Sequence, residues 1–204
     1  WSAFADEIEM LKKEREHKNL LPGVKINENI DLITDISGIK DCDIVIFAIP
    51  SSFVRKIAVM AAPFIKKDAV VVNAGKGLED DTFKRLSVVL SEEIPDNKIV
   101  SISGPSHAEE VALGYPTTVT VASLDRDAMY YIQDELSNES FRIYACDDII
   151  GVEMGGAMKN IIALCAGICD GMGYGDNTKA ALMTRGMTEI ARLGVKLGGS
   201  PETF

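Results

Sequence analysis

Cysteine, histidine and long uncharged apolar runs are all scarce in this sequence, and each scarcity excludes a class of protein. The four cysteines form no C-x-x-C pair and there are only two histidines, which argues against a metal site and favours reduced thiols. No uncharged apolar stretch reaches the ~20 residues that cross a bilayer, and no signal peptide is recognisable. We therefore expect a cytoplasmic protein with no integral membrane segment and no bound metal.

Basic residues are also in short supply. Aspartate and glutamate number 31 against 21 lysines and arginines, so the net charge is −10. Such a chain would repel a phosphate backbone, and we expect no nucleic-acid partner. A small anionic substrate held by a local group of lysines stays compatible with this charge. The 204 residues are 47% hydrophobic, enough for a substantial core in one or two domains.

Strand and helix patterns alternate along the first part of the chain. The β-rich apolar runs predict strands, and the first two are typical of strands covered on both faces. These runs are residues 43–50, 68–73, 98–103, 117–122 and 141–144, with a further short strand at 24–26. The helical patterns are residues 4–18, 51–65, 82–93 and 125–136. Another helix is expected after Ser106, which forms an S-x-x-E capping box with Glu109.

Strands that alternate with helices predict a mostly parallel sheet with right-handed crossovers. After Asp147 the strand pattern stops, and two long helices are expected at about 149–170 and 177–197. The fold class is therefore α/β: a truncated Rossmann-type sheet in residues 1–146, then part of an all-helical C-terminal domain in residues 147–204. Because the chain starts at Trp1 and stops abruptly, we expect a fragment cut at both ends.

One lysine lies where a charge is not expected. Between Gly151 and Cys169 only Glu153 and Lys159 are charged, in a helix that is apolar nearly all round and should be buried. A buried ammonium is costly unless it is paired or serves a purpose, so we interpret Lys159 as functional. The alternative is a lysine that snorkels from a helix end or neutralises a hidden carboxylate. The nearby pair Gly155–Gly156 indicates close approach of a ligand or of a neighbouring helix.

Three predicted strand ends carry candidate ligand-binding groups, because ligands of an open parallel sheet lie beyond the carboxyl ends of its strands. Pro50 cannot extend the sheet, so the chain leaves the sheet there and exposes its backbone to a ligand. The alternative is an ordinary strand-to-helix turn. Lys76 lies between two glycines that let the backbone approach a ligand, although an exposed turn lysine has the same pattern. The segment Gly104–Ala108 leads into a helix start, which suits a phosphate or is ordinary capping.

Lys76 and Lys159 are both placed to reach a cleft between the sheet and the helical domain. Two lysines near one oxyanion suit the reduction of a carbonyl, since one can protonate the oxygen while the other holds an anionic group. Mutual repulsion and desolvation would lower a lysine pKa toward the useful range.

Several segments, in order along the chain, resemble the bacterial type of NAD(P)-dependent glycerol-3-phosphate dehydrogenase. They are Ala48–Ser51, Asn73–Glu79, Ser103–Glu110, Gly151–Asn160 and Thr184–Gly186. The resemblance covers essentially the whole chain. It implies an oxidoreductase that interconverts sn-glycerol 3-phosphate and dihydroxyacetone phosphate with NAD or NADP, for phospholipid synthesis. It also implies a small phosphorylated substrate, and it allows a homodimer.

The resemblance also implies roles for individual residues. Lys159 matches the proton acceptor in alcohol oxidation, which is the proton donor in ketone reduction. The substrate-binding positions are Lys76, Gly104, Ser106, Lys159 and Asn160. The cofactor-binding positions are Trp1, Pro50, Lys76 and Ala108, and Trp1 would close a strand of the nucleotide-binding fold near the adenosine ribose.

Departures from the family pattern matter as well. The first βαβ unit, with its Gly-rich pyrophosphate turn, would precede Trp1, and further helical residues that hold the ligands would follow Phe204. We therefore expect the fragment by itself to be inactive. Ala3 stands where many relatives carry an arginine or histidine for a 2′-phosphate, which favours NAD over NADP. The alternatives are another hydroxyacid or hydroxyacyl-CoA dehydrogenase of this architecture, or a nucleotide-binding regulatory protein without turnover.

Overall fold

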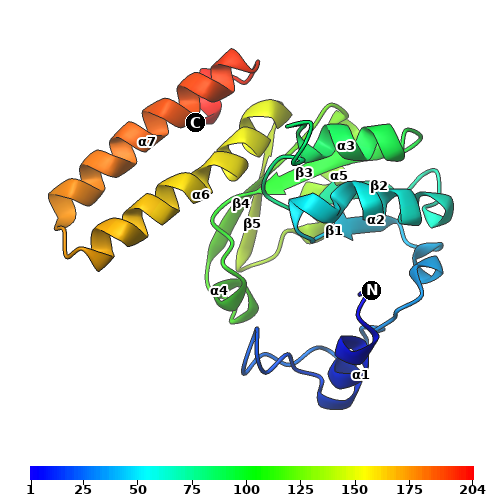
Figure 1. The fold of residues 1–204 in the computed structure, drawn as a ribbon. Helices are drawn as coiled ribbons and strands as arrows, with labels where there is room; N and C mark the ends of the chain where they lie inside the picture. The colour runs from blue at the N-terminus through cyan, green and yellow to red at the C-terminus, as the bar shows by residue number, and fades with distance from the viewer.

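The computed structural model describes residues 1–204 and contains one five-stranded sheet in the order β1-β2-β3-β4-β5 (Figure 1). The strands are β1 (Ile44–Phe47), β2 (Val70–Asn73), β3 (Lys98–Ser103), β4 (Thr117–Ser123) and β5 (Phe141–Cys146). β1, β2 and β3 are parallel, β4 runs antiparallel to β3, and β5 is parallel to β4. The predicted mostly parallel sheet is therefore confirmed. Residues 24–26 form no strand, only an isolated bridge from Lys25 to Glu16.

Helices cover both faces of the sheet because successive strand side chains point to opposite sides. The helices are α1 (Ala5–Glu14), α2 (Val54–Ala61), α3 (Leu86–Glu93), α4 (Ala108–Ala112), α5 (Arg126–Leu136), α6 (Ile149–Gly171) and α7 (Asp176–Lys196). Val71 of β2 joins the buried cluster that α2 and α3 form on one face. Its neighbour Val72 joins the cluster that α5 forms on the other. These two clusters are the core of the sheet region.

The prediction that both faces of the strand are covered is confirmed for β2, whose residues are all buried, and is wrong for β1. β1 is an edge strand of this sheet, and Ile46 is 49% exposed.

Three predicted helices differ from the structure for local reasons. In the segment 51–65, α2 has a 3₁₀ turn before it and another after it. Pro63, which has no N–H to donate, lies in the second turn. α3 starts later than predicted, at Leu86, because a bridge between Leu78 and Arg85 folds the preceding residues into a loop. α1 ends early, where Arg15 adopts a left-handed conformation with φ of 51°.

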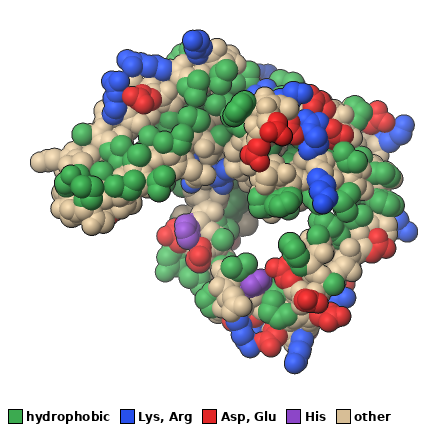
Figure 2. Space-filling view, in the orientation of Figure 1, with side chains coloured by type: hydrophobic (Ala, Val, Ile, Leu, Met, Phe, Trp, Pro, Cys, Tyr) green, Lys and Arg blue, Asp and Glu red, His purple; other side chains and the backbone are tan.

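α6 and α7 are the two long helices predicted after the sheet, and they pack against each other (Figure 1). The first half of α6 is buried on β3 and β4, whereas Ile161, Leu164 and Ile168 in the second half are at least half exposed. The expectation that α6 is buried all round is therefore wrong, because beyond its first half it has only α7 beside it. Figure 2 shows hydrophobic side chains left on the surface of this helix pair.

α6 also bears on the question of a membrane segment. By length and composition alone it is apolar enough to cross a bilayer, the one helix of this chain that is. Its first half is buried in the protein and carries the buried carboxylate of Glu153. It is therefore a partly buried core helix and not a membrane span.

The four cysteines are free thiols.

Candidate active site

A cavity of about 780 Å³ opens between the end of β3, the loop into α4, and the middle of α6. Its lining brings together most of the residues singled out in the sequence, from elements far apart in the chain. They are Lys76, Gly104, Ser106, Ala108 and Lys159. No group of His, Cys, Asp and Glu side chains in the chain has the arrangement of a metal site.

The two lysines share this cavity without a carboxylate partner. Lys76 is half-buried and Lys159 is exposed, and neither takes part in any ion pair of the chain. Burial lowers the pKa of the Lys76 ammonium, and the positive charge of Lys159 lowers it further. Lys159 is thus not buried, contrary to the sequence prediction, because this turn of α6 lies at the mouth of the cavity. The two lysines nevertheless line one cavity, as predicted.

The loop that carries Lys76 is held by the side chain of Asn73 and packs against the end of β1. The Asn73 side chain accepts a hydrogen bond from the Gly75 N–H and donates one to the Gly75 carbonyl, each at 3.1 Å. A Cβ atom at Gly75 would lie 3.0 Å from the Ile49 carbonyl oxygen. The turn therefore lies directly against the chain that leaves β1 at Pro50, so the first two strand ends meet as predicted.

A charged clamp fixes the same loop further along. Arg55 of α2 forms a bidentate pair with Glu79, at 2.5 and 2.9 Å, and also bonds Glu92 and Glu93 of α3. The Arg55 guanidinium, helped by the Thr82 hydroxyl, lowers the pKa of the Glu79 carboxyl to about 2. Sequence reasoning missed this clamp because its members are too far apart in the chain to form a local pattern.

α6 approaches the sheet most closely at Gly156. A Cβ atom there would lie 2.5 Å from the Ser103 Oγ and 3.7 Å from the Lys76 Cγ. Gly155 has no such neighbour, since the nearest atom to its Cβ position is 4.0 Å away in Phe204. The glycine pair therefore serves close packing on the end of β3, and only its second member requires it.

The third strand end is built differently from the prediction. α4 begins at Ala108 with His107 as its N-cap residue, and no side chain caps it. Ser106 instead donates from Oγ to the Gly104 carbonyl at 3.4 Å, and Glu109 pairs with His107 at 2.5 Å. The prediction of a capping box is therefore wrong, because Ser106 lies outside the helix and Glu109 pairs with His107 instead. A Cβ at Gly104 would lie 2.9 Å from the Val119 Cα, so only glycine fits where β3 leaves the sheet.

Three predicted positions lie outside the lining of this cavity. Pro50 follows β1 at the neighbouring strand end, and Asn160 is exposed on α6. Trp1 lies in no strand; it borders a separate apolar hollow of about 240 Å³ beside β1 and donates from its indole N–H to the Thr34 carbonyl at 2.8 Å. The strand expected at Trp1 is therefore not formed.

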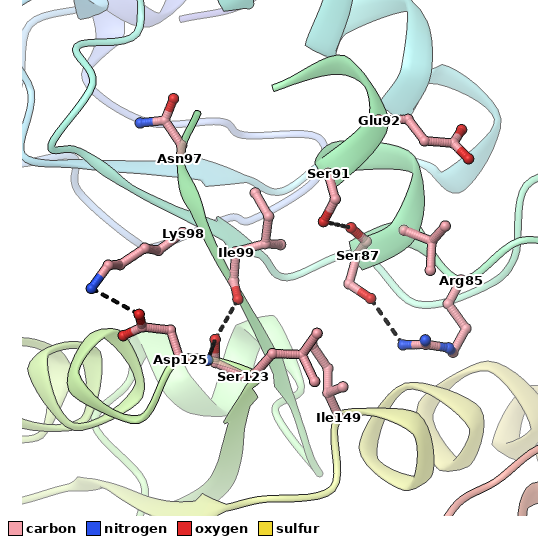
Figure 3. A pocket seen from close by; sticks show the side chains of 12 residues that line it. Arg85, Ser87, Ser91, Glu92, Asn97, Lys98, Ile99, Ser123, Asp125 and Ile149 are labelled. Carbon is pink, nitrogen blue, oxygen red and sulfur yellow. Dashed lines mark hydrogen bonds and ion pairs between the residues drawn. The ribbon is translucent and has the colours of Figure 1, made fainter. Parts of the chain in front are cut away.

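Glu153 stood out in the sequence only as a charge in an apolar helix, and its contacts, which join α6 to α3, were not predicted. Its carboxylate accepts hydrogen bonds from Arg85 Nη1 at 2.8 Å and from the Ser87 N–H at 2.9 Å. The Ser87 hydroxyl donates a third bond at 2.5 Å. Figure 3 shows Arg85 and Ser87 at one side of another cavity, of about 510 Å³, between α3 and the β3–β4 pair. A lone carboxylate in an apolar helix is the sequence signal that identifies Glu153.

The residues present fit part of a nicotinamide dinucleotide site. The clustered ends of β1, β2 and β3 offer backbone that a flat ring can approach, and the lysine pair suits a phosphate or an oxyanion. No G-x-G-x-x-G turn for a pyrophosphate occurs within the 204 residues. The fit is therefore to the reacting end of the cofactor and to the substrate.

Fold and cavity together define an α/β protein of the Rossmann type, with its ligand site at the carboxyl ends of the parallel strands. Comparison with known families is in accord. The profile described as the N-terminus of NAD-dependent glycerol-3-phosphate dehydrogenase matches residues 1–129, and the corresponding C-terminal profile matches residues 148–204. The chain therefore belongs to the NAD-dependent glycerol-3-phosphate dehydrogenase family.

Individual relatives support this membership. The glycerol-3-phosphate dehydrogenase (NAD(P)+) of Bacillus subtilis is 50% identical over 208 residues, covering 100% of this chain and 60% of that protein. The corresponding protein of Moorella thermoacetica is 51% identical, covering 100% of this chain and 61% of the relative. The solved glycerol-3-phosphate dehydrogenase of Coxiella burnetii superposes with a TM-score of 0.94 at 33% identity, over 100% of this chain and 62% of that one. The chain thus spans about 60% of the length of its curated relatives.

Proposed function

We propose that the full-length protein is an NAD(P)-dependent oxidoreductase that interconverts sn-glycerol 3-phosphate and dihydroxyacetone phosphate. The observation that carries this proposal is the pair of unpartnered lysines, Lys76 and Lys159, on one cavity at the strand ends. Family membership supports the same activity, since the relatives from B. subtilis and M. thermoacetica bear that enzyme's name.

In this proposal Lys159 is the acid–base residue. When bound, the nicotinamide supplies a hydride to C2 of the ketone in one direction and takes it up in the other. Lys159 Nζ donates a proton to the C2 oxygen during reduction, so ketone, hydride and proton together give the alcohol. In the reverse direction the neutral Lys159 amine accepts that proton. Its exposure at the cavity mouth lets it exchange the proton with solvent.

Other residues hold the ligands. Lys76, with its lowered pKa, lies deeper in the cavity and would contact both substrate and cofactor. The substrate-binding set that we propose is Lys76, Gly104, Ser106, Lys159 and Asn160. The cofactor-binding set is Trp1, Pro50, Lys76 and Ala108, and Ala3 favours NAD over NADP.

We further propose a domain boundary between residues 146 and 147, a cytoplasmic location, a homodimer, and a role in supplying glycerol 3-phosphate for phospholipid synthesis. The boundary is supported by the change from strands to long helices after β5.

The test is oxidation of NADH or NADPH by the full-length protein with dihydroxyacetone phosphate as the acceptor. We expect turnover with this substrate and none with a panel of 2-keto acids and 3-ketoacyl-CoA esters. Preference for a member of that panel would replace the substrate assignment. Cofactor binding without any oxidation would instead indicate a regulatory protein.

A further inference from the structure

Glu153 is the only charged side chain among the buried residues of the chain, with 7% of its surface exposed. A buried carboxylate is strongly unfavourable unless it is paired and fully hydrogen-bonded. Glu153 meets this condition through one guanidinium, one backbone N–H and one hydroxyl. A hydrophobic residue would serve simple packing at such a position, so the charge calls for another explanation.

The donors to Glu153 come from the start of α3. The Ser87 N–H lies in the first turn of that helix, where backbone N–H groups have no partner within the helix. Glu153 therefore caps α3 from outside, and this fixes one turn of α6 to the sheet region. Gly156 and Lys159 follow at intervals of three residues along α6, so each lies about 60° around the helix from the one before it. Lys159 is about 9 Å along the helix axis from this anchor.

The same carboxylate also reaches the loop that carries the other lysine. Arg85 ends that loop and is bridged to Leu78 near its beginning, two residues after Lys76. The bond from Arg85 to Glu153 therefore joins the Lys76 loop to the Lys159 helix. Figure 3 shows Arg85 and Ser87 pointing toward each other at this junction, where they are 3.0 Å apart.

We propose that Glu153 is a positioning residue: by binding Arg85 and Ser87 it sets the separation of Lys159 from Lys76 across the cavity. Its effect on catalysis rests on the function proposed above. Its effect on geometry does not, because both lysines line the same cavity whatever the substrate is.

The first test measures geometry without substrate or cofactor. In the full-length protein, competitive acylation followed by mass spectrometry gives the pH at which Lys76 becomes nucleophilic. The charged group that acts on Lys76 is Lys159 from α6, and the other titratable groups that line the cavity are His107, Glu109 and Glu110 at α4. Glu153→Gln removes the charge that pairs with Arg85, so we expect α6 to move away from the Lys76 loop and Lys159 to repel Lys76 less.

We expect the midpoint of the pH dependence of Lys76 acylation to rise by about half a pH unit. At a pH below this midpoint, Lys76 should therefore be acylated about threefold more slowly than in the unmodified protein. Glu153→Asp, which keeps the charge, should recover part of the shift. Glu189→Gln breaks only an exposed pair with Arg185 on α7 and should leave Lys76 unchanged. An unchanged midpoint in a folded Glu153→Gln protein would overturn the proposal.

If the Glu153→Gln protein does not fold, the same measurement is made on the Ser87→Ala variant. It removes one donor and keeps both the Arg85 pair and the backbone bond. A smaller rise of the Lys76 midpoint supports the proposal, and no rise contradicts it.

The second test measures turnover, and it separates this proposal from the assignment of the enzyme. We expect kcat for dihydroxyacetone phosphate to fall about tenfold in Glu153→Gln and to recover partly in Glu153→Asp, since small misplacements of catalytic groups have effects of this order. If the unmodified protein shows no turnover, the proposed function fails while the acylation result still decides the positioning role. Normal turnover in Glu153→Gln would overturn the positioning role alone.

Discussion

Gly156 marks the place where α6 touches the end of β3, and adding one methyl group there tests that contact. In a Gly156→Ala variant the new Cβ would lie 2.5 Å from the Ser103 Oγ, about 0.5 Å inside the shortest contact that real Cβ atoms show. Helix propensity alone would stabilise the variant by about 1 kcal/mol. Overpacking costs about 1–3 kcal/mol, so we expect Gly156→Ala to lower the free energy of unfolding by about 1 kcal/mol.

Matched variants isolate this effect in equilibrium urea unfolding. Gly155→Ala, with no atom closer than 4.0 Å, should stabilise the protein by up to about 1 kcal/mol. In the double variant Gly156→Ala with Ser103→Ala, the Oγ is absent and the Cβ atom of residue 103 lies 3.6 Å from the new Cβ. The double variant should therefore recover the stability that Gly156→Ala loses. Equal stability of the two single alanine variants would refute the reasoning, since Ser103 would then turn aside at no cost.

Three further predictions concern the framework around the cavity. Arg55→Met should destabilise the protein above pH 4.5; because the Glu79 pKa is lowered from 4.5 to about 2, the gap from the unmodified protein should shrink as the pH falls between these values, measured by urea unfolding. Asp148→Asn should lower the free energy of unfolding by about 1–2 kcal/mol, because the two carboxylate oxygens accept three hydrogen bonds and the amide nitrogen of asparagine cannot accept any. Gly186→Ala, whose Cβ would lie 2.6 Å from Ile162, should lower the melting temperature, while Gly167→Ala, with nothing within 4 Å, should raise it.

Much of the fold could be predicted because local patterns report it directly. The strand from Val70 to Asn73 begins with three valines, and such an apolar β-branched run is typical of a strand inside a sheet. Helix starts were less predictable. The loop before Leu86 depends on a bridge between Leu78 and Arg85 and on Phe83 in a left-handed conformation with φ of 55°. No local pattern shows such pairing in advance.

The sequence predicted that two lysines would line one cavity, but it did not predict the residues that support them. Lys76 and Lys159 stand out because a lysine between glycines and a lysine in an apolar helix are both unusual. Their supports, Arg55 and Glu153, bind partners distant in sequence, 24 and 66–68 residues away. Burial of Lys159 was wrongly predicted because composition describes α6 as a whole, whereas only its first half lies against the sheet.

The central claim is that Lys159 transfers the proton at the carbonyl oxygen, and steady-state kinetics of Lys159→Ala in the full-length protein test it most directly. Lys196→Ala, which removes an exposed lysine near the end of α7, is the matched control. We expect Lys159→Ala to lower kcat for dihydroxyacetone phosphate by about 10²–10⁴-fold, while the control keeps normal turnover. Unchanged kcat in a folded Lys159→Ala protein would contradict the account.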